Sequence, residues 1–143
     1  MMRERVVGEA MSWLGTPYMH HQSCKGHGAD CVGFVYGVYK AVGLIPADWK
    51  PPAYSRQWHL HQNEELLVEG VLRLGGWELA IDQALPGDVV TFQYGKVASH
   101  VAIALPDQRV IHAHMDVGRV TVTLFVGSFK ARARKAFRLP GLD

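Results

Sequence analysis

The stretch of sequence that decides the fold is Gly26-His27-Gly28-Ala29-Asp30-Cys31-Val32-Gly33-Phe34-Val35. Asp30 predicts the start of a helix, because Asp is a preferred N-cap and apolar residues follow it at helical spacing until Gly43 ends the run. Cys31 then lies in the first turn, beside unbonded N–H groups and the positive end of the helix dipole, which favour a thiolate. Cys31 is therefore a candidate nucleophile, although a free cysteine is more often a small buried apolar residue.

The rest of the N-terminal half reads as helices joined by irregular chain. Residues 3–14 predict a first helix with Leu14 on its apolar side, ended by a glycine. A polar loop over 18–29 leads to the cysteine helix, and a stretch rich in proline and aromatic residues over 45–58 follows it. Residues 64–74 return to helical periodicity.

After Pro86-Gly87-Asp88 the pattern changes to short runs rich in β-branched residues. We predict strands over residues 89–94, 99–105, 109–114, 119–126 and 135–139. Helices followed by strands are typical of an α+β fold, in which a helical layer packs on one face of an antiparallel sheet of about five strands. The length of 143 residues suits one domain over residues 1–143.

Composition excludes several classes of function. Fifteen Lys and Arg against thirteen Asp and Glu give a net charge of +2, too small for a general electrostatic grip on nucleic acid. No run approaches the roughly 20 apolar residues of a membrane span. The N-terminus lacks the apolar core of a signal peptide, so we expect synthesis in the cytoplasm without a signal peptide.

His100 is the candidate base for a cysteine nucleophile. It stands near the start of a predicted strand and shares a face with the small residues Ala102 and Ala104, which leaves room for another layer. A three-residue turn would place His100 opposite His114 and diagonal to His112, so either of these could orient its imidazole. A plain solvent-facing role is the alternative for each of the three.

Histidines and cysteines near the helix start also raise the possibility of zinc. The potential ligands are His20, His21, Cys24, His27 and Cys31. Structural zinc usually joins two ligand pairs that are a dozen or more residues apart, whereas these side chains crowd into one loop. We therefore expect no metal site and interpret the residues before Cys31 as loop.

Five ordered motifs together resemble the NlpC-type cell-wall peptidases. They are Trp13-Leu14-Gly15-Thr16-Pro17-Tyr18, the stretch from Lys25 to Val35, Pro86-Gly87-Asp88-Val89-Val90, Ser99-His100-Val101-Ala102-Ile103 and Val110-Ile111-His112-Ala113. The resemblance implies a papain-like fold and a cysteine endopeptidase that cuts the peptide stems of bacterial peptidoglycan, with no cofactor.

The same resemblance assigns roles to individual residues. It implies that Cys31 is the nucleophile, that His100 is the general base and acid, and that His112 is the third polar residue. It also implies that Tyr18 stands beside the nucleophile to help the oxyanion or the substrate, and that Asp30 contacts the amine end of a stem peptide. Helix capping is the simpler role for Asp30.

The chain departs from the family pattern at Val32, where many members carry a serine that contributes to the substrate pocket. Val32 and the segment 51–59 resemble the subset encoded among phage tail and gene-transfer-agent genes. This subset implies delivery on a phage-like tail, with tail hub or tip proteins as partners. We expect the protein to reside in such a tail.

Two rival functions and one surface feature complete the predictions. The rivals are a papain-like amidase or acyltransferase acting on another amide or ester, and a non-enzymatic tail-tip protein whose triad is covered. The basic run comprises Lys130, Arg132, Arg134, Lys135 and Arg138. We interpret it as a solvated sheet edge, with binding of an anionic wall polymer or a tail protein as the alternative.

Overall fold

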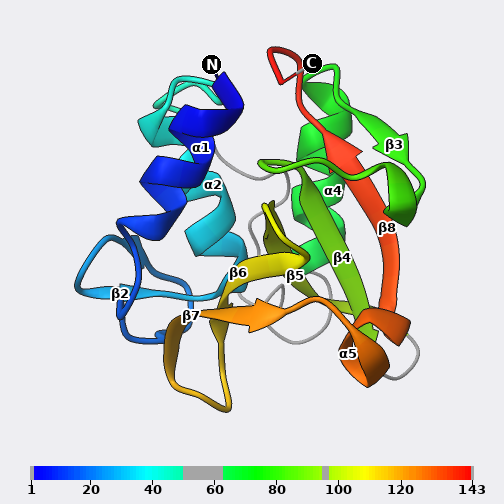
Figure 1. Cartoon of the computed structure of the whole chain (residues 1–143). Coiled ribbons are helices and arrows are strands. Elements are labelled where there is room, and N and C mark those ends of the chain that lie inside the picture. Colours follow the sequence, from blue (N-terminus) through cyan, green and yellow to red (C-terminus); the bar gives the residue numbers. More distant parts are fainter. Residues whose placement is uncertain (1, 50–62, 95–96, 143) are drawn as a thin grey trace.

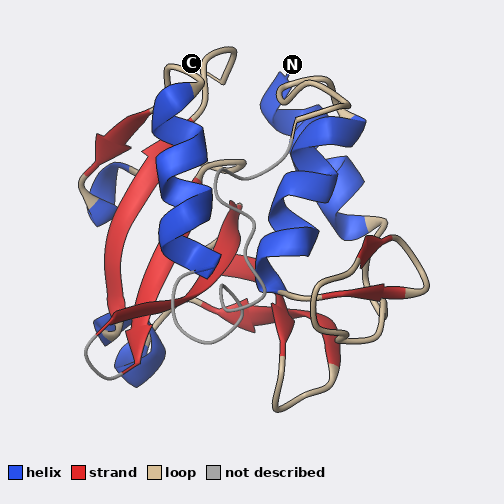
Figure 2. Cartoon of the chain, turned by 180° about the vertical axis from the view of Figure 1, so that it is seen from behind, coloured by secondary structure: helices blue, strands red, loops and turns tan. Residues whose placement is uncertain are grey.

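The computed structural model describes residues 2–49, 63–94 and 97–142, and it confirms the α+β architecture. In these described ranges, three helices precede most of the sheet: α1 (Met2–Met11), α2 (Cys31–Ala41) and α4 (Asn63–Arg73) (Figure 1). They lie together on one face of the sheet when the molecule is viewed from behind (Figure 2). The helical layer on an antiparallel sheet is the arrangement that the order of elements predicts.

Within the described residues the main sheet has six strands, in the order β3-β8-β4-β5-β6-β7. Their bounds are β3 (Trp77–Leu79), β4 (Val89–Tyr94), β5 (Val97–Leu105), β6 (Arg109–His114), β7 (Arg119–Leu124) and β8 (Ala133–Arg138). Neighbouring strands in this order all pair antiparallel. Strand β3 was not predicted, because three residues are too few to show the alternation of apolar and polar side chains that marks a strand.

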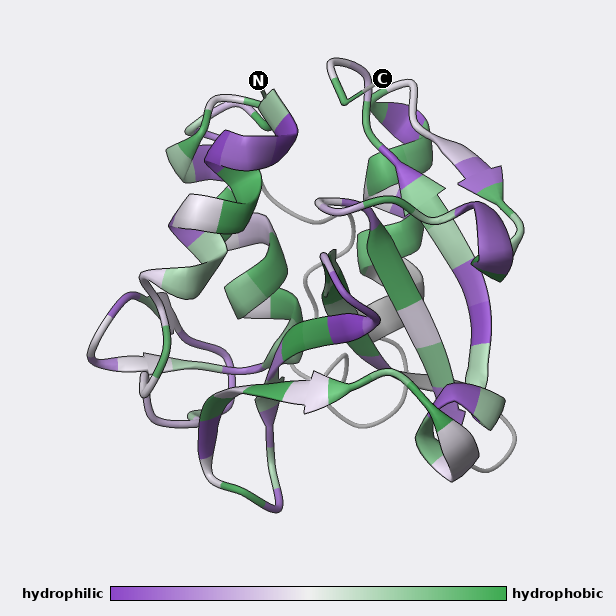
Figure 3. Cartoon of the chain, in the orientation of Figure 1, coloured by the Kyte–Doolittle hydropathy of each residue, from purple (hydrophilic) through white to green (hydrophobic). Residues whose placement is uncertain are grey.

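The helices and the sheet enclose the larger of two cores. It contains Val6 and Ala10 of α1, Phe34 and Val38 of α2, and residues such as Ile103 on the facing side of the strands. In Figure 3, α2 and β4 are mostly hydrophobic, whereas the peripheral turns mix hydrophilic and hydrophobic residues. Burial of these apolar faces is the main stabilising contribution to the fold.

The other face of the sheet has a smaller core that the sequence did not predict. Val90, Phe92, Ala102 and Val110 lie on this face, and Phe129 is among the residues that pack on them. Phe129 belongs to α5 (Gly127–Ala131), a short helix within the stretch between the last two predicted strands. A short 3₁₀ helix, η1 (Ile81–Gln83), adds Ile81 to the same layer.

Two predictions around the first helix need correction. The helix ends at Met11, and Leu14 lies in the turn beyond it with 46% of its surface exposed. The polar stretch 18–29 contains a small hairpin, β1 (Ser23–Cys24) and β2 (Gly28–Ala29). These two-residue strands are too short to be read from sequence.

The chain after α1 is tied to β7 before it reaches the hairpin. Gly15 donates its N–H to the carbonyl oxygen of Val120 (3.0 Å), and the N–H of Val120 donates to the carbonyl oxygen of Thr16 (2.8 Å). The Thr16 hydroxyl in turn accepts from the N–H of Gly26 (3.0 Å). These bonds hold the Trp13–Tyr18 motif against β7 and against the hairpin that leads to α2.

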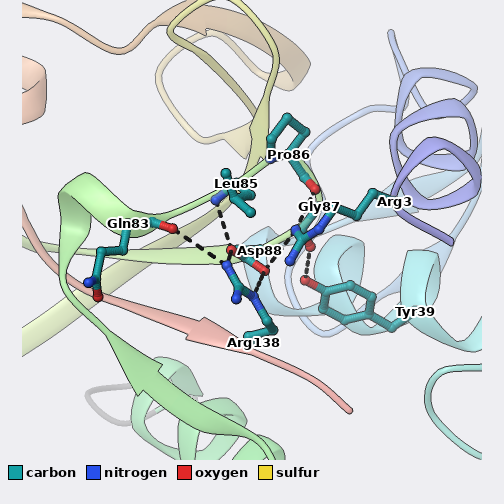
Figure 4. A network of polar contacts seen from close by, with 8 residues as sticks. All are labelled: Arg3, Tyr39, Gln83, Leu85, Pro86, Gly87, Asp88 and Arg138. Carbon is teal, nitrogen blue, oxygen red and sulfur yellow. Dashed lines mark hydrogen bonds and ion pairs between the residues drawn. The ribbon is translucent and has the colours of Figure 1, made fainter. Parts of the chain in front are cut away.

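The interpretation of the basic run as a sheet edge is wrong for Arg138, but it fits Arg134 and Lys135, which are exposed and precede the residues of β8 that pair with β3. β8, which carries most of it, lies inside the sheet between β3 and β4. Arg138 forms an ion pair with Asp88 (2.9 Å), which is fully buried, and Arg3 of α1 reaches the same carboxylate (3.1 Å) (Figure 4). Tyr39 of α2 donates its hydroxyl to the carbonyl oxygen of Gly87 (2.6 Å), so this network joins two helices to the sheet.

The aromatic segment over 45–58 lies outside the described residues from position 50 onward. Of its described part, Trp49 packs edge-on against Tyr36 of α2, with ring centroids 6.1 Å apart. Among the residues that the structure describes, no helix is long and apolar enough to cross a membrane.

Candidate active site

Asp30 caps α2 as the sequence predicts. Its Oδ1 accepts the N–H of Gly33 (2.7 Å) and its Oδ2 accepts the N–H of His21 (2.8 Å). Burial raises the pKa of Asp30, while these two backbone N–H groups oppose the rise. The carboxyl therefore fixes both the start of the helix and the loop before it. Its predicted contact with a stem-peptide amine stays a prediction.

Cys31 is the first residue of α2 and only 6% of its surface is exposed. The N–H groups of the first turn are partly used already, because Gly33 donates to the Asp30 side chain and Phe34 to its carbonyl oxygen (2.9 Å). An oxyanion bound here would be stabilised by the positive end of the α2 dipole and by an N–H group of its first turn. Val32 is 1% exposed and packs in the larger core.

His100 stands directly after a bulge in β5. Phe92 pairs with His100 and Gln93 pairs with Ala98, so one residue of β5 is left over between them. Bulges increase the local twist and re-aim neighbouring side chains, which is why they are common beside active sites. As predicted, His100 shares its face with Ala102. The layer that covers this face is that of Phe129 rather than the helices.

His100 is hydrogen-bonded to the diagonal histidine and not to the one opposite. Its Nε2 lies 2.6 Å from Nδ1 of His112, and the Nε2 of His112 lies 2.8 Å from Oγ1 of Thr123 in β7. The ring of His114 is 6.1 Å from that of His100. Of the two partners that the residues left open, the structure brings His112 to His100.

His114 is held by the turn between β6 and β7. Its Nδ1 accepts the N–H groups of Asp116 (3.1 Å) and Val117 (3.3 Å), so its ring proton is on Nε2 in the neutral form. Its ring centroid lies 5.0 Å from that of His112. The three imidazoles form one cluster on β5 and β6.

Burial, together with the neighbouring His112 and His114, lowers the pKa of His100 to about 3. Burial, with His114, likewise lowers the pKa of His112 to about 4. A second positive charge in the cluster is unfavourable because the rings are so close. Both imidazoles are consequently neutral near pH 7, and a neutral His100 is able to accept a proton.

Helix α2 packs against β5 and β6, the strands that carry His100 and His112. The amino-terminal end of α2 points toward β6 (Figure 1). The helix of the candidate nucleophile and the imidazole pair therefore belong to one packed unit. The direct pairing of Cys31 with His100 stays a prediction.

Tyr18 lies next to the start of α2 through its backbone. It forms a parallel bridge with Ala29, and its N–H donates to the carbonyl oxygen of Gly118 in the turn before β7 (2.9 Å). Its ring meets that of His20 edge-on, with centroids 5.5 Å apart. The predicted role of Tyr18 beside the nucleophile stays a prediction.

A hollow of about 280 Å³ opens beside His100. Tyr94, His114, Met115 and Asp116 line it together with His100. The sequence reading missed Tyr94 and Thr123. Thr123 could have been found from the alternation in Arg119-Val120-Thr121-Val122-Thr123, since the pairing with β6 places it diagonal to His112.

The histidines and cysteines that suggested zinc are dispersed around the small hairpin. Among the described residues, no group of three or more His, Cys, Asp or Glu side chains is arranged to hold a metal ion. Cys24 is exposed, and His21 has a left-handed backbone conformation with φ of 61°. The N–H of His21 is bonded to the cap residue Asp30, which gives this part of the loop a structural role.

Comparison with solved structures places this architecture among known proteins. The NlpC/p60 domain of the peptidoglycan hydrolase SagA is 27% identical and superposes with a TM-score of 0.64, over 96% of this chain and 98% of that one. An NlpC/P60 family protein from Bacillus cereus is 20% identical (TM-score 0.68), with 99% of this chain matching 40% of that one. This chain thus spans about two fifths of the Bacillus protein.

RipD from Mycobacterium tuberculosis, described as a non-catalytic NlpC/p60 domain protein adapted to peptidoglycan binding, is 15% identical (TM-score 0.62), over 96% of this chain and 95% of that one. No curated protein matches the chain. The model of the NlpC/P60 family matches residues 15–138, a span that begins before Tyr18 and contains α2 and every strand of both sheets. The chain therefore belongs to the NlpC/P60 family of cell-wall peptidases.

Proposed function

We propose that this protein is a cysteine endopeptidase that hydrolyses amide bonds in the peptide stems of bacterial peptidoglycan. The observation that carries the proposal is the 2.6 Å contact between Nε2 of His100 and Nδ1 of His112. This contact occupies Nε2 of His100. Nδ1 is then the ring nitrogen that would accept the proton of the Cys31 thiol. A nucleophile, a base and an orienting group are the parts of an activated thiol.

The thiol and the imidazole must meet where β5 begins. Val101 faces the core beneath α2, whereas His100 is on the opposite face of the same strand. A group at the start of α2 therefore reaches His100 past the strand end and not through the sheet. The bulge before His100 turns the strand at this point, which supports such an approach.

The reaction then follows from the positions of these groups. His100 takes the proton of the Cys31 thiol at Nδ1 as sulfur attacks the carbonyl carbon of the stem peptide. The developing oxyanion is stabilised by first-turn N–H groups of α2. His100 returns the proton to the leaving amine, and the acyl group stays on sulfur as a thioester. Water, activated by His100, hydrolyses the thioester and restores the thiol.

The low pKa of His100 keeps its imidazole in the unprotonated form that a base requires, and it also makes that base a weak one. Its value of about 3 means that the imidazole is neutral before substrate binds. The proton therefore moves during attack instead of resting on a preformed imidazolium. Nδ1 of His112 accepts from the charged imidazole at Nε2 and stabilises it when it forms.

Two observations bear on the substrate. SagA, which matches along nearly the whole of both chains, is a peptidoglycan hydrolase. The hollow beside His100 is lined in part by solvent-exposed residues such as Asp116. It therefore opens at the protein surface, where a polymer substrate can reach it. The likeness to RipD keeps a binding protein without catalysis as the alternative, and an amidase or acyltransferase for another substrate is the second.

Digestion of purified muropeptides, read by mass spectrometry, tests the proposal. The wild type should release stem-peptide fragments, Cys31→Ala should release none, and the matched control Cys24→Ala should match the wild type. Identical fragments from wild type and Cys31→Ala would contradict the proposal. Turnover of small acyl esters without muropeptide cleavage would support the amidase or acyltransferase, and binding to insoluble peptidoglycan without cleavage would support the binding protein.

We further propose that the enzyme acts in cell-wall penetration by a phage-like tail or gene transfer agent. The support is the resemblance of Val32 and of the segment 51–59 to the members encoded among tail genes. The test is mass spectrometry of purified particles from the source organism. Peptides of this protein that co-purify with tail hub or tip proteins would support it, and their confinement to the particle-free fraction would contradict it.

A further inference from the structure

The structure extends the imidazole pair by a third member on β7. Thr123 Oγ1 lies 2.8 Å from Nε2 of His112, whose other nitrogen faces His100. The three side chains form a chain of diagonal contacts across β5, β6 and β7. His112 is fully buried, so both of its ring nitrogens depend on these two partners.

The proton on His112 decides whether His100 is a base. If Nε2 of His112 carries the proton, it donates to Thr123, and Nδ1 accepts from Nε2 of His100. Neutral His100 then has its lone pair on Nδ1. If Nδ1 of His112 carries the proton, it donates to Nε2 of His100, and neutral His100 has its proton on Nδ1. In that arrangement His100 does not accept a proton from Cys31.

When His100 is charged, only one position of the proton on His112 is compatible with the hydrogen bond between the two rings. An imidazolium at His100 carries protons on both nitrogens, so its Nε2 must donate to Nδ1 of His112. His112 then has its own proton on Nε2, and Thr123 is the acceptor that the structure provides. A hydroxyl has lone pairs for this purpose, whereas a methyl group in its place would leave a buried N–H without a partner.

We propose that Thr123 is a positioning residue that accepts the Nε2–H of His112, so that Nδ1 of His112 accepts from Nε2 of His100 and Nδ1 of His100 stays available as the base. This inference rests on the proposed function. It adds a residue that acts on the reaction through two others and touches neither the thiol nor the reacting carbonyl. The ring of Phe129 supports the arrangement by packing on His112, with centroids 5.5 Å apart.

The matched variants are Thr123→Val, which keeps the shape and removes the hydroxyl, and Thr123→Ser, which keeps the hydroxyl. Thr123→Val should lower kcat about ten- to a hundredfold and leave KM within about twofold. This is the range expected when a hydrogen-bond partner of the orienting residue is lost. Thr123→Ser should stay within about threefold of wild type. Equal losses in both variants would mean a packing role and would overturn the inference.

Nitrogen-15 NMR of the histidine rings tests the tautomer without any activity. The wild type and Thr123→Ser should show His112 protonated at Nε2, and Thr123→Val should shift it toward Nδ1. An unchanged His112 tautomer in Thr123→Val would overturn the inference. Because this readout needs no substrate, a wild type that cleaves no muropeptide would contradict the proposed function alone.

Discussion

Nε2 of His100 and Nδ1 of His112 lie 2.6 Å apart, while the ring of His114, which stands opposite His100 in the extrapolated register, keeps a centroid distance of 6.1 Å. The diagonal neighbour is thus the hydrogen-bonded one. Because only a bonded partner fixes the orientation of the base, the two histidines should differ sharply in their effect on catalysis.

His112→Ala should lower kcat for muropeptide cleavage by roughly a hundredfold or more, as expected when the group that orients a catalytic histidine is lost. His114→Ala should stay within about tenfold, since it bonds the turn and not His100. Steady-state kinetics, with circular dichroism to confirm folding, compare the two. A larger loss from His114→Ala would reverse the assignment.

The imidazole pair should make the protein less stable in acid. In the unfolded chain both groups bind a proton near pH 6.5, whereas in the folded protein the pKa values are about 3 and about 4. Between pH 6.5 and 4 the unfolded state binds more protons, so the free energy of unfolding falls as the pH falls, by up to about 1.4 kcal/mol per pH unit for each group.

Urea unfolding at pH 7, 6 and 5 measures this slope, and His112→Gln should remove about half of it. Stability that rises on acidification over this range would show that the folded protein holds charged imidazoles, and an unchanged slope in the variant would show that His112 is not among the groups responsible.

Gly33 is required by the close approach of the loop to the helix start. A Cβ at this position would meet the carbonyl oxygen of Gln22 and lie 2.9 Å from Oδ1 of Asp30, whereas a Cβ at Gly8 in α1 would meet nothing within 4 Å. Gly33→Ala should lower the free energy of unfolding by about 2 kcal/mol or more. Gly8→Ala, the matched control, should raise it by about 0.5–1 kcal/mol. Urea unfolding that gives similar changes in the free energy of unfolding for Gly33→Ala and Gly8→Ala would refute the steric argument.

Asp88 links α1, β4 and β8 through its two arginine partners. Two guanidinium groups share this one carboxylate, so the site already carries more positive than negative charge. Among the described residues, Nη2 of Arg3 is also buried without a hydrogen-bond partner. Asp88→Asn would leave both guanidinium groups without their counter-ion and should cost about 3–5 kcal/mol. Glu69→Gln, which breaks an exposed pair with Arg73, should cost no more than about 0.5 kcal/mol in the same melts.

Features that depend on neighbouring residues in sequence could be predicted. Asp30 caps α2 because its side chain bonds an N–H three residues later, a local interaction that composition and order reveal. The three-residue turn after Leu105 set the register of β5 and β6, and with it the nearness of His100 to the other two histidines. These local rules led to the candidate site.

Features that depend on strand order or side-chain direction could not. The basic run resembles an edge, yet the end of β8 pairs with both β3 and β4. Nothing local to its sequence says which strands flank it. The residues alone allow either His112 or His114, and the family resemblance pointed to His112; the ring positions show that His112 is the bonded one. Thr123 was not predicted as a site residue because threonine is common in strands. Its role depends on the contact with His112 on the neighbouring strand, which the sequence does not show.

Alkylation of the thiols by iodoacetamide, followed together with muropeptide cleavage, tests the central claim most directly. Mass spectrometry after partial reaction gives the fraction of each cysteine modified, and Cys24→Ala removes the exposed competitor. Residual cleavage should fall in direct proportion to the fraction of unmodified Cys31 and should not depend on Cys24. Full cleavage by protein whose Cys31 is completely alkylated would contradict the assignment of Cys31 as the nucleophile.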